Sequence, residues 1–234
     1  MSVGRPSSAK ARRARIPEPT VSRLPQYRRL LEAMDDRRIA TVSSVELADA
    51  AGVNAATLRR DLSCLGTCGT PGTGYDVPRL REMVDRALAL GRDWPVVIAG
   101  AGYLGHALAR SRGFNSGGFR VAALVDIDPA QVGTVVAGAV VVHLDELDDV
   151  VRRERVALGV VATPASAAAE VVRRLATAGV GAVLNFAPGF VAAPPGVTVR
   201  NVDLAAELQV LTFYAARSVP SPTDGAGAPG RALG

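Results

Sequence analysis

The 234-residue sequence predicts an α/β protein in two parts: a winged helix-turn-helix, then a doubly wound parallel sheet followed by a last helix. Three observations lead to this fold class. An apolar strand runs into a Gly-x-Gly-x-x-Gly turn at Gly100–Gly105. Strand and helix patterns alternate after that turn, which is typical of a parallel sheet with helices on both faces. Two short helices joined by a tight turn come before it.

The predicted helix-turn-helix spans about residues 27–66. Ser43, with Glu46 three residues later, forms a capping-box pattern that opens a helix ending at Gly52. Asn54 caps the next helix, which carries two arginines. A helix before this pair is predicted from Pro25 to Arg38, because Pro25 suits a first turn.

A glycine-rich hairpin, the wing, is expected within residues 66–75, with its tip around Pro71-Gly72. An amphipathic helix over residues 78–91 then links to the sheet. We therefore divide the chain into six segments: 1–20 disordered basic tail, 21–78 winged-helix domain, 79–94 linker helix, 95–200 dinucleotide-type (Rossmann) domain, 201–218 last helix, and 219–234 disordered tail.

The net charge of +5 comes entirely from the first part of the chain. Residues 1–90 hold 15 basic and 10 acidic side chains, whereas residues 91–234 hold 12 of each. This asymmetry favours a nucleic-acid contact, although a basic disordered tail would also explain it.

The second helix of the pair is the predicted recognition helix, because such a helix places its N-terminal residues and arginines on DNA. The alternative is a solvated helical face on which Arg60 and Asp61 pair with each other. The candidate DNA-binding residues are Ser43, Ser44, Asn54, Thr57, Arg59, Arg60 and Gly72.

The Gly100–Gly105 turn predicts a dinucleotide site. Its glycines allow a tight turn, close approach to a pyrophosphate, and helix–strand packing. Asp126 ends the next predicted strand, 21 residues after Gly105, where an acid binds the ribose and favours NAD over NADP. The alternative is that the glycines only pack helix on strand. The candidate cofactor-binding residues are Gly100, Ala101, Gly102, Tyr103, Leu104, Gly105, Asp126, Asp128, Thr163 and Pro164.

The cysteines, the histidines and the lengths of the apolar runs argue against a disulfide-bonded protein, a metalloprotein, an enzyme and a membrane protein. Cys64 and Cys68 make no disulfide framework or metal cluster, and His106 and His143 have no acid–base partner in the sequence. We therefore predict no metal site and no catalytic residue. No apolar run is long enough to cross a membrane, and no apolar stretch follows the basic N-terminus, so we expect a cytoplasmic protein.

The segments, in this order, resemble the Rex family of redox-sensing transcriptional repressors over about residues 16–217. A generic dinucleotide-binding protein shares only the glycines. The runs that carry the resemblance are residues 16–27, Val42–Ala48, Arg59–Ser63, Gly69–Tyr75, the Gly100–Gly105 turn, Leu184–Pro188 and Val202–Gln209.

The resemblance implies a homodimer whose last helix is exchanged between protomers, with Asp203, Glu207 and Phe213 at the dimer and switch region. It also implies a repressor that binds operator DNA when NAD⁺ is high or the site is empty, and releases it when NADH binds. The sequence departs from the family pattern at four places. Pro71 replaces a wing arginine, and Tyr103 replaces an asparagine of the turn. Ser111 replaces a tyrosine that contacts the acid corresponding to Asp203. At the end of the recognition helix, a tyrosine and two phenylalanines of the family are replaced by Cys64, Leu65 and Cys68.

The predicted function is therefore an NADH-responsive DNA-binding repressor, and not an enzyme. Two alternatives remain. One is a small NAD-dependent oxidoreductase, against which stands the absence from the sequence of a substrate domain and of an acid–base pair. The other is a DNA-binding paralogue whose nucleotide site does not switch.

Overall fold

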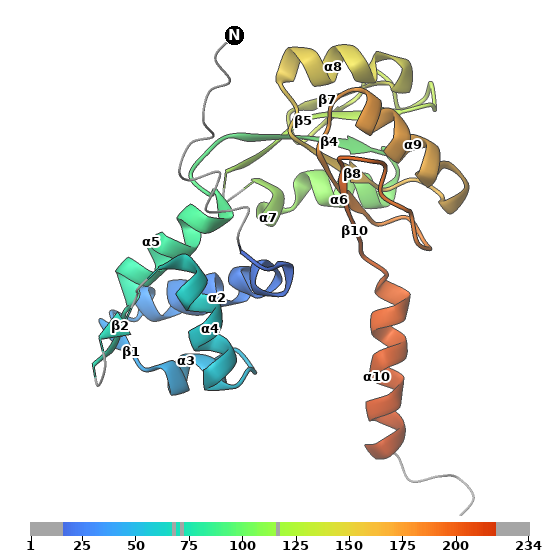
Figure 1. Cartoon of the computed structure of the whole chain (residues 1–234). Helices are drawn as coiled ribbons and strands as arrows, with labels where there is room; N and C mark the ends of the chain where they lie inside the picture. Colours follow the sequence, from blue (N-terminus) through green and yellow to red (C-terminus); the bar gives the residue numbers. More distant parts are fainter. Residues whose placement is uncertain (1–15, 67–68, 71–72, 116–117, 219–234) are drawn as a thin grey trace, which may run out of the picture. The chain divides into compact units, whose positions relative to one another are not determined.

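The computed structural model describes residues 16–66, 69–70, 73–115 and 118–218, and Figure 1 labels their elements. The chain divides into two compact units, and the boundary in the sequence lies between Arg92 and Asp93. We describe each unit by itself.

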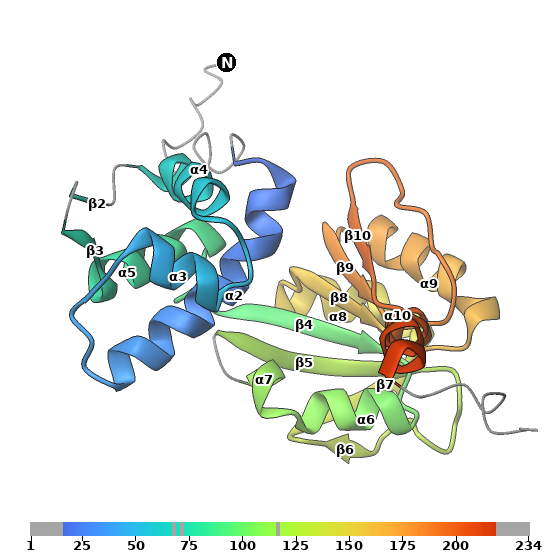
Figure 2. The same cartoon turned by 90° about the horizontal axis from the view of Figure 1, so that it is seen from below.

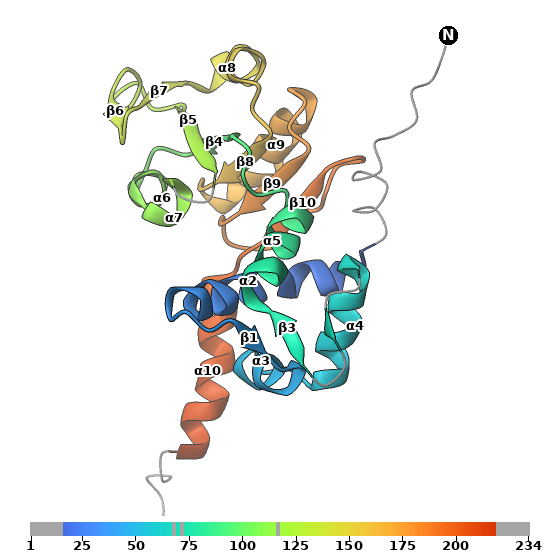
Figure 3. The ribbon, with the colours of Figure 1, turned by 90° about the vertical axis from the view of Figure 1, so that its left-hand side faces the viewer.

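The N-terminal unit is a helical domain with a small antiparallel sheet, as predicted, and it can be followed in Figure 3. Its strands are ordered β1-β3-β2, and β2 and β3 form the wing hairpin. Its elements are α2 (Glu18–Asp36), β1 (Thr41–Val42), α3 (Ser44–Ala50), α4 (Ala55–Leu65), β2 (Gly69–Thr70), β3 (Gly74–Asp76) and α5 (Val77–Leu88).

Helix α2 begins earlier than the sequence predicted. We expected disorder up to residue 20 and a helix from Pro25, but the helix starts at Glu18 and Pro25 lies inside it. Its buried face, Thr20, Leu24, Tyr27 and Leu31, continues across the proline. Packing of this face therefore outweighs the hydrogen bond that Pro25 cannot donate.

The helix predicted over residues 79–94 is present, but it ends earlier, at Leu88. Helix α5 covers only Val77–Leu88, and its buried residues belong to the core of the N-terminal unit. Ion pairs also tie it to α2: Arg28 Nε lies 2.8 Å from Asp85, and Arg81 pairs with Asp35. The helix is therefore an integral part of this unit.

The C-terminal unit contains a seven-stranded sheet in the order β10-β9-β8-β4-β5-β7-β6. All neighbouring strands are parallel except the pair formed by β6 and β7. The strands are β4 (Trp94–Ala99), β5 (Phe119–Asp126), β6 (Val135–Val136), β7 (Ala139–His143), β8 (Leu158–Val161), β9 (Ala182–Asn185) and β10 (Thr198–Asn201).

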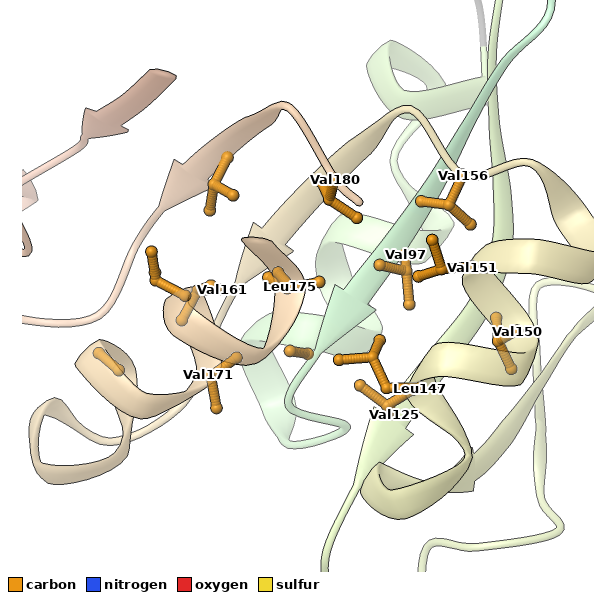
Figure 4. Close-up of a cluster of buried hydrophobic side chains, with 14 of the residues drawn as sticks. Val97, Val125, Leu147, Val150, Val151, Val156, Val161, Val171, Leu175 and Val180 are labelled. Carbon is orange, nitrogen blue, oxygen red and sulfur yellow. The ribbon is translucent and has the colours of Figure 1, made fainter. Parts of the chain in front are cut away.

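Helices cover both faces of this sheet, which confirms the doubly wound prediction (Figure 2). Helices α6 (Tyr103–Arg110) and α7 (Arg112–Asn115) lie on one face, and α8 (Leu147–Glu154) and α9 (Ala165–Thr177) lie on the other. Figure 4 shows the core between the sheet and α8 and α9, where Val97, Leu147 and Leu175 are fully buried. This packing holds the strand ends in fixed positions.

Two local features of this unit were not predicted. The short strand β6 pairs antiparallel with β7 after the left-handed residue Gly133. Residues 144–146 form a 3₁₀ turn, capped by His143, before α8 begins. Both features are too short for a periodic pattern to reveal.

The last helix, α10 (Leu204–Ser218), has no buried face within the part of the chain that the structure describes. Every side chain from Leu204 to Arg217 is exposed, including Phe213 at 61%. The side chain of Asp203 caps its first turn by accepting from the backbone N–H groups of Ala205 and Ala206. An apolar helix exposed along its length needs a partner surface.

Candidate nucleotide site and DNA-binding helix

The three glycines of the turn after β4 face different surroundings. A Cβ at Gly100, whose φ is +105°, would lie 2.5 Å from the carbonyl oxygen of Ala162. A Cβ at Gly105 would lie 1.8 Å from the carbonyl oxygen of Gly100. A Cβ at Gly102 would meet nothing within 4 Å.

Gly100 and Gly105 are therefore needed by the fold, as the packing alternative expected. Gly102 is not, because its φ is −77° and its missing side chain leaves open space. That space lies at the N-terminus of α6, where backbone N–H groups lack partners within the helix and attract an anion. The arrangement fits a bound pyrophosphate.

Asp126 lies at the carboxyl end of β5, beside this turn, as predicted. One carboxylate oxygen accepts from the N–H of Ala101 at 2.6 Å. The other accepts from the N–H groups of Ile127 and Asp128. Asp126 thus orders both loops at the site, a role that the sequence did not indicate. Asp128 is exposed, and its carboxylate accepts from the N–H of Ala130.

Thr163 and Pro164 follow β8 at the same edge of the sheet. The hydroxyl oxygen of Thr163 is buried without a hydrogen-bond partner, and its backbone N would lie 3.2 Å from a Cβ at Gly100. Buried hydroxyls in proteins are nearly always paired. An unpaired one beside the glycine turn fits a polar ligand group. The Nε2 atom of His106, on α6, is also buried and unpaired.

Large apolar side chains stand exposed around this edge. Tyr103 is fully exposed at the start of α6, and Leu104 is 39% exposed. Ile127 follows β5, and Phe190 follows β9 with 83% of its surface exposed. These side chains offer flat apolar contacts to a ligand ring or to a second protein surface.

In the N-terminal unit, α4 has a buried face and an exposed face. Leu58, Leu62 and Leu65 pack in the core, whereas Arg59 and Arg60 are exposed. One guanidinium nitrogen of Arg59 donates to Ser44 Oγ at 3.3 Å. Both predicted caps of the helix pair are present: Ser43 forms a full capping box with Glu46, and Asn54 accepts from Thr57 N.

Asp61, which is 1% exposed, does not pair with Arg60. Its carboxylate accepts from Thr20, from Arg23 and from the Tyr27 hydroxyl at 2.8 Å. Burial alone would raise the pKa of Asp61, but these hydrogen bonds outweigh it and hold that pKa below its ordinary value. Burial, together with the bond to Asp61, raises the pKa of Tyr27 to about 12. This network ties α4 to α2 and leaves both arginines of α4 facing outward.

Three of the residues singled out in the sequence, Cys68, Pro71 and Gly72, lie outside the described residues. Cys64 is half-buried, and its thiol donates to the carbonyl oxygen of Arg60. Among the residues that the structure describes, no cluster of metal-ligating side chains and no helix long and apolar enough to cross a membrane is found.

Sequence reasoning missed the pair Asn185 and Asn201. Asn185 is fully buried, and its Nδ2 donates to Asn201 Oδ1 at 2.9 Å, at the carboxyl ends of β9 and β10. The only signal was the run Leu184–Pro188, which supported the family resemblance without a role for Asn185.

Comparison with known families assigns the same two units. Residues 15–63 match the family described as "Putative DNA-binding protein N-terminus", and residues 91–189 match the family described as "CoA binding domain". The chain is 52% identical over 231 residues to the redox-sensing transcriptional repressor Rex of Streptomyces coelicolor, covering 98% of this chain and 90% of that protein.

Two solved structures share the fold. The chain covers 94% of RSP, a Rex-family repressor, in its complex with β-NAD⁺ and operator DNA, at 30% identity with a TM-score of 0.81. It covers 96% of RSP in complex with β-NADH, at 29% identity with a TM-score of 0.79. Each match spans 87% of this chain.

A winged helix-turn-helix joined to a Rossmann-type unit defines a DNA-binding regulator with a nucleotide site, and the named relatives are repressors rather than enzymes. Within that class, the chain belongs to the Rex family of redox-sensing transcriptional repressors.

Proposed function

We propose that this protein is a transcriptional repressor that binds operator DNA through α4 and releases it when NADH binds at the glycine turn. The observations that carry the proposal are the open space at Gly102 and the unpaired Thr163 hydroxyl, both at the carboxyl edge of the sheet. The same chain presents two outward arginines on α4. RSP, its structural relative, has been solved with both nucleotides and with operator DNA.

In the nucleotide site, the backbone N–H groups of the Gly100–Gly105 turn would hold the pyrophosphate. Asp126 and Asp128 would bind ribose hydroxyls, and their negative charge disfavours the additional phosphate of NADP. Thr163 and Pro164 would line the nicotinamide side, with Tyr103 and Leu104 at the entrance.

In the DNA contact, Arg59 and Arg60 would reach base edges or phosphates of the major groove. Asn54 and Thr57 lie at the N-terminal end of α4, the end that such helices direct at the bases. Ser43 and Ser44 would lie near the sugar-phosphate backbone of the DNA. Gly72 would contact DNA as part of the wing. A repressor of this kind acts in the cytoplasm.

We place a second copy of the chain against α10, which makes the repressor a homodimer. The apolar side chains of α10 are exposed, and a second apolar surface is open on the sheet: a hollow of about 370 Å³ lined by residues such as Val96, Phe119 and Leu184. Two unburied apolar surfaces on one chain favour self-association. Asp203, Glu207 and Phe213 would lie at this interface.

The proposal is tested by separating the two binding activities. Gly102→Ala should weaken NADH binding at least about tenfold, because the new methyl group takes the space of the pyrophosphate, while thermal stability and operator binding stay near wild type. Arg59→Ala should weaken operator binding by a similar factor and leave NADH binding unchanged. Calorimetry with NADH and fluorescence anisotropy with a palindromic operator measure the two.

The matched controls are Gly100→Ala and Arg79→Ala. Gly100→Ala should lower thermal stability, because its Cβ meets backbone. Arg79→Ala removes an exposed positive charge of the same unit, from α5, and should leave operator binding nearly unchanged. Normal NADH binding by Gly102→Ala, or equal losses with the two arginine variants, would refute the assigned sites.

A further inference from the structure

Asn185 and Asn201 end two neighbouring strands in one row of the sheet. The parallel registers pair Ala99 with Val161, Val161 with Asn185, and Asn185 with Asn201. The row therefore crosses β4, β8, β9 and β10. The glycine turn, the Thr163 turn, the loop 186–191 and the segment leading to α10 all leave the sheet from this one level.

The two asparagine side chains hold the loop 186–191 at both ends. Asn185 donates to Ala187 O and accepts from Ala187 N at 3.1 Å. Asn201 accepts from Val191 N at 3.1 Å and donates to Val191 O. The bond between Asn185 and Asn201 joins these two attachments. Beyond Phe186, these side-chain hydrogen bonds hold the loop at Ala187 and Val191, and the loop presents the exposed Phe190.

The chain leads from Asn201 directly into α10, and the backbone of Asn185 holds the first residue of this segment. The N–H of Val202 donates to Asn185 O at 2.8 Å, and Asp203, the next residue, caps the helix. Asn185, which is buried, and Asn201, which is half-buried, thus lie between a loop at the ligand-binding edge and the segment from which the exposed helix begins. Packed and hydrogen-bonded contacts of this kind can carry coupling between sites when both ends have two arrangements.

The connection back to the nucleotide site is also continuous. The N–H of Phe186 donates to Val161 O at 2.8 Å, and the N–H of Ala162 donates to Ala99 O at 2.7 Å. Gly100, which follows Ala99, packs against the carbonyl group of Ala162. Each step joins neighbouring strands at the level where a dinucleotide binds.

We propose that Asn185 and Asn201 are positioning residues that transmit nucleotide occupancy from the carboxyl edge of the sheet to helix α10. This inference rests on the proposed function, because it assumes that NADH occupies the glycine turn. It assigns the pair a role in coupling rather than in binding, since neither side chain reaches the open space at Gly102 through any described contact.

The test compares Asn201→Leu with Asn201→Asp in the full chain. Leucine keeps the number and branching of the side-chain heavy atoms and removes the three side-chain hydrogen bonds of Asn201. Aspartate keeps the acceptors for Asn185 and Val191 N, and loses only the donor to Val191 O. Thr177→Val, at an exposed position on α9, is the control.

Three quantities are measured for each variant: the NADH dissociation constant, the factor by which NADH weakens operator binding, and hydrogen exchange in the nucleotide-free protein. We expect Asn201→Leu to keep the NADH dissociation constant within about threefold of wild type. The factor by which NADH weakens operator binding should fall about tenfold. Exchange should rise together at residues 187–191 and in the first turn of α10. Asn201→Asp should fall between this variant and wild type, and Thr177→Val should match wild type.

The inference and the proposed function fail in different ways. A wild-type protein whose operator binding ignores NADH refutes the proposed function, and the inference with it. A responsive wild type with an equally responsive Asn201→Leu refutes the inference alone, as does increased exchange confined to the loop. If Asn201→Leu does not fold, a wild-type NADH factor in Asn201→Asp, together with unchanged exchange at Val191, overturns the inference.

Discussion

At the scale of residues, Asp61 explains why two arginines on α4 point outward. Its carboxylate lies in the core between α4 and α2 and is bound by Thr20, Arg23 and Tyr27. Because Asp61 is held on the inner face, Arg59 and Arg60, its neighbours in sequence, are directed to solvent on the outer face.

Asp61→Asn should therefore destabilise the N-terminal unit by about 2 kcal/mol, because a charge-assisted hydrogen bond to Arg23 is lost. The folded state lowers the pKa of Asp61, so its stabilisation is present above the ordinary carboxyl pKa and is lost as the pH falls through the lowered value. The stability gap between wild type and variant should be full near neutral pH and should shrink in acid.

Urea unfolding followed by the NMR signals of α2 and α4 measures this gap. Asp49→Asn, at an exposed position on α3, is the control and should be as stable as wild type. A gap of the same size in acid as at neutral pH would show that the carboxylate charge is not what holds α4.

The residues that sequence reasoning found and missed differ in one respect. Gly100, Asp126 and Thr163 belong to a spacing with a known physical reason, so their positions at one sheet edge were predictable. The partners of Asp61 and Asn201 are set by tertiary packing, and nothing in the local sequence marks them.

At the scale of elements, α10 is the one helix whose partner the described chain does not supply. Its apolar residues Leu204, Leu208 and Leu211 recur at helical spacing, and all are exposed. If α10 forms the proposed dimer interface, Leu208→Arg should make the protein monomeric, since a buried unpaired charge opposes the interface.

Analytical ultracentrifugation measures the change in mass, and operator affinity should fall about a hundredfold as the second half-site contact is lost. Gln209→Arg adds the same charge one residue further along and serves as the control. A Leu208→Arg variant that is still dimeric would show that α10 does not form the dimer interface.

Elements were predictable where local chemistry decides them. The caps at Ser43 and Asn54 and the apolar strand ending at Ala99 are local signals, and the structure confirms each one. Pro25 was misleading, because tertiary contacts extend α2 through it. The amphipathic pattern of α5 predicted a helix, but it did not reveal that the apolar face packs in the N-terminal core, because a sequence pattern does not say against what a face packs.

At the scale of the whole molecule, the features expected for DNA binding and for nucleotide binding lie in different units. The N-terminal unit holds the excess of basic side chains, and the C-terminal unit holds the glycine turn at the edge of its parallel sheet. Each unit has its own hydrophobic core. Such a chain can act as a sensor only if nucleotide binding and DNA binding share a free-energy coupling.

The central claim is that NADH binding and operator binding are coupled. Reciprocal titrations test this claim most directly. Operator affinity is measured by fluorescence anisotropy at fixed salt, with NADH and then with NAD⁺, and NADH affinity is measured with and without operator. We predict that NADH weakens operator binding about tenfold or more, that NAD⁺ leaves it unchanged, and that operator weakens NADH binding by the same factor. Operator binding that is equally strong with NADH, with NAD⁺ and without nucleotide, in a protein that binds both ligands, would contradict the account.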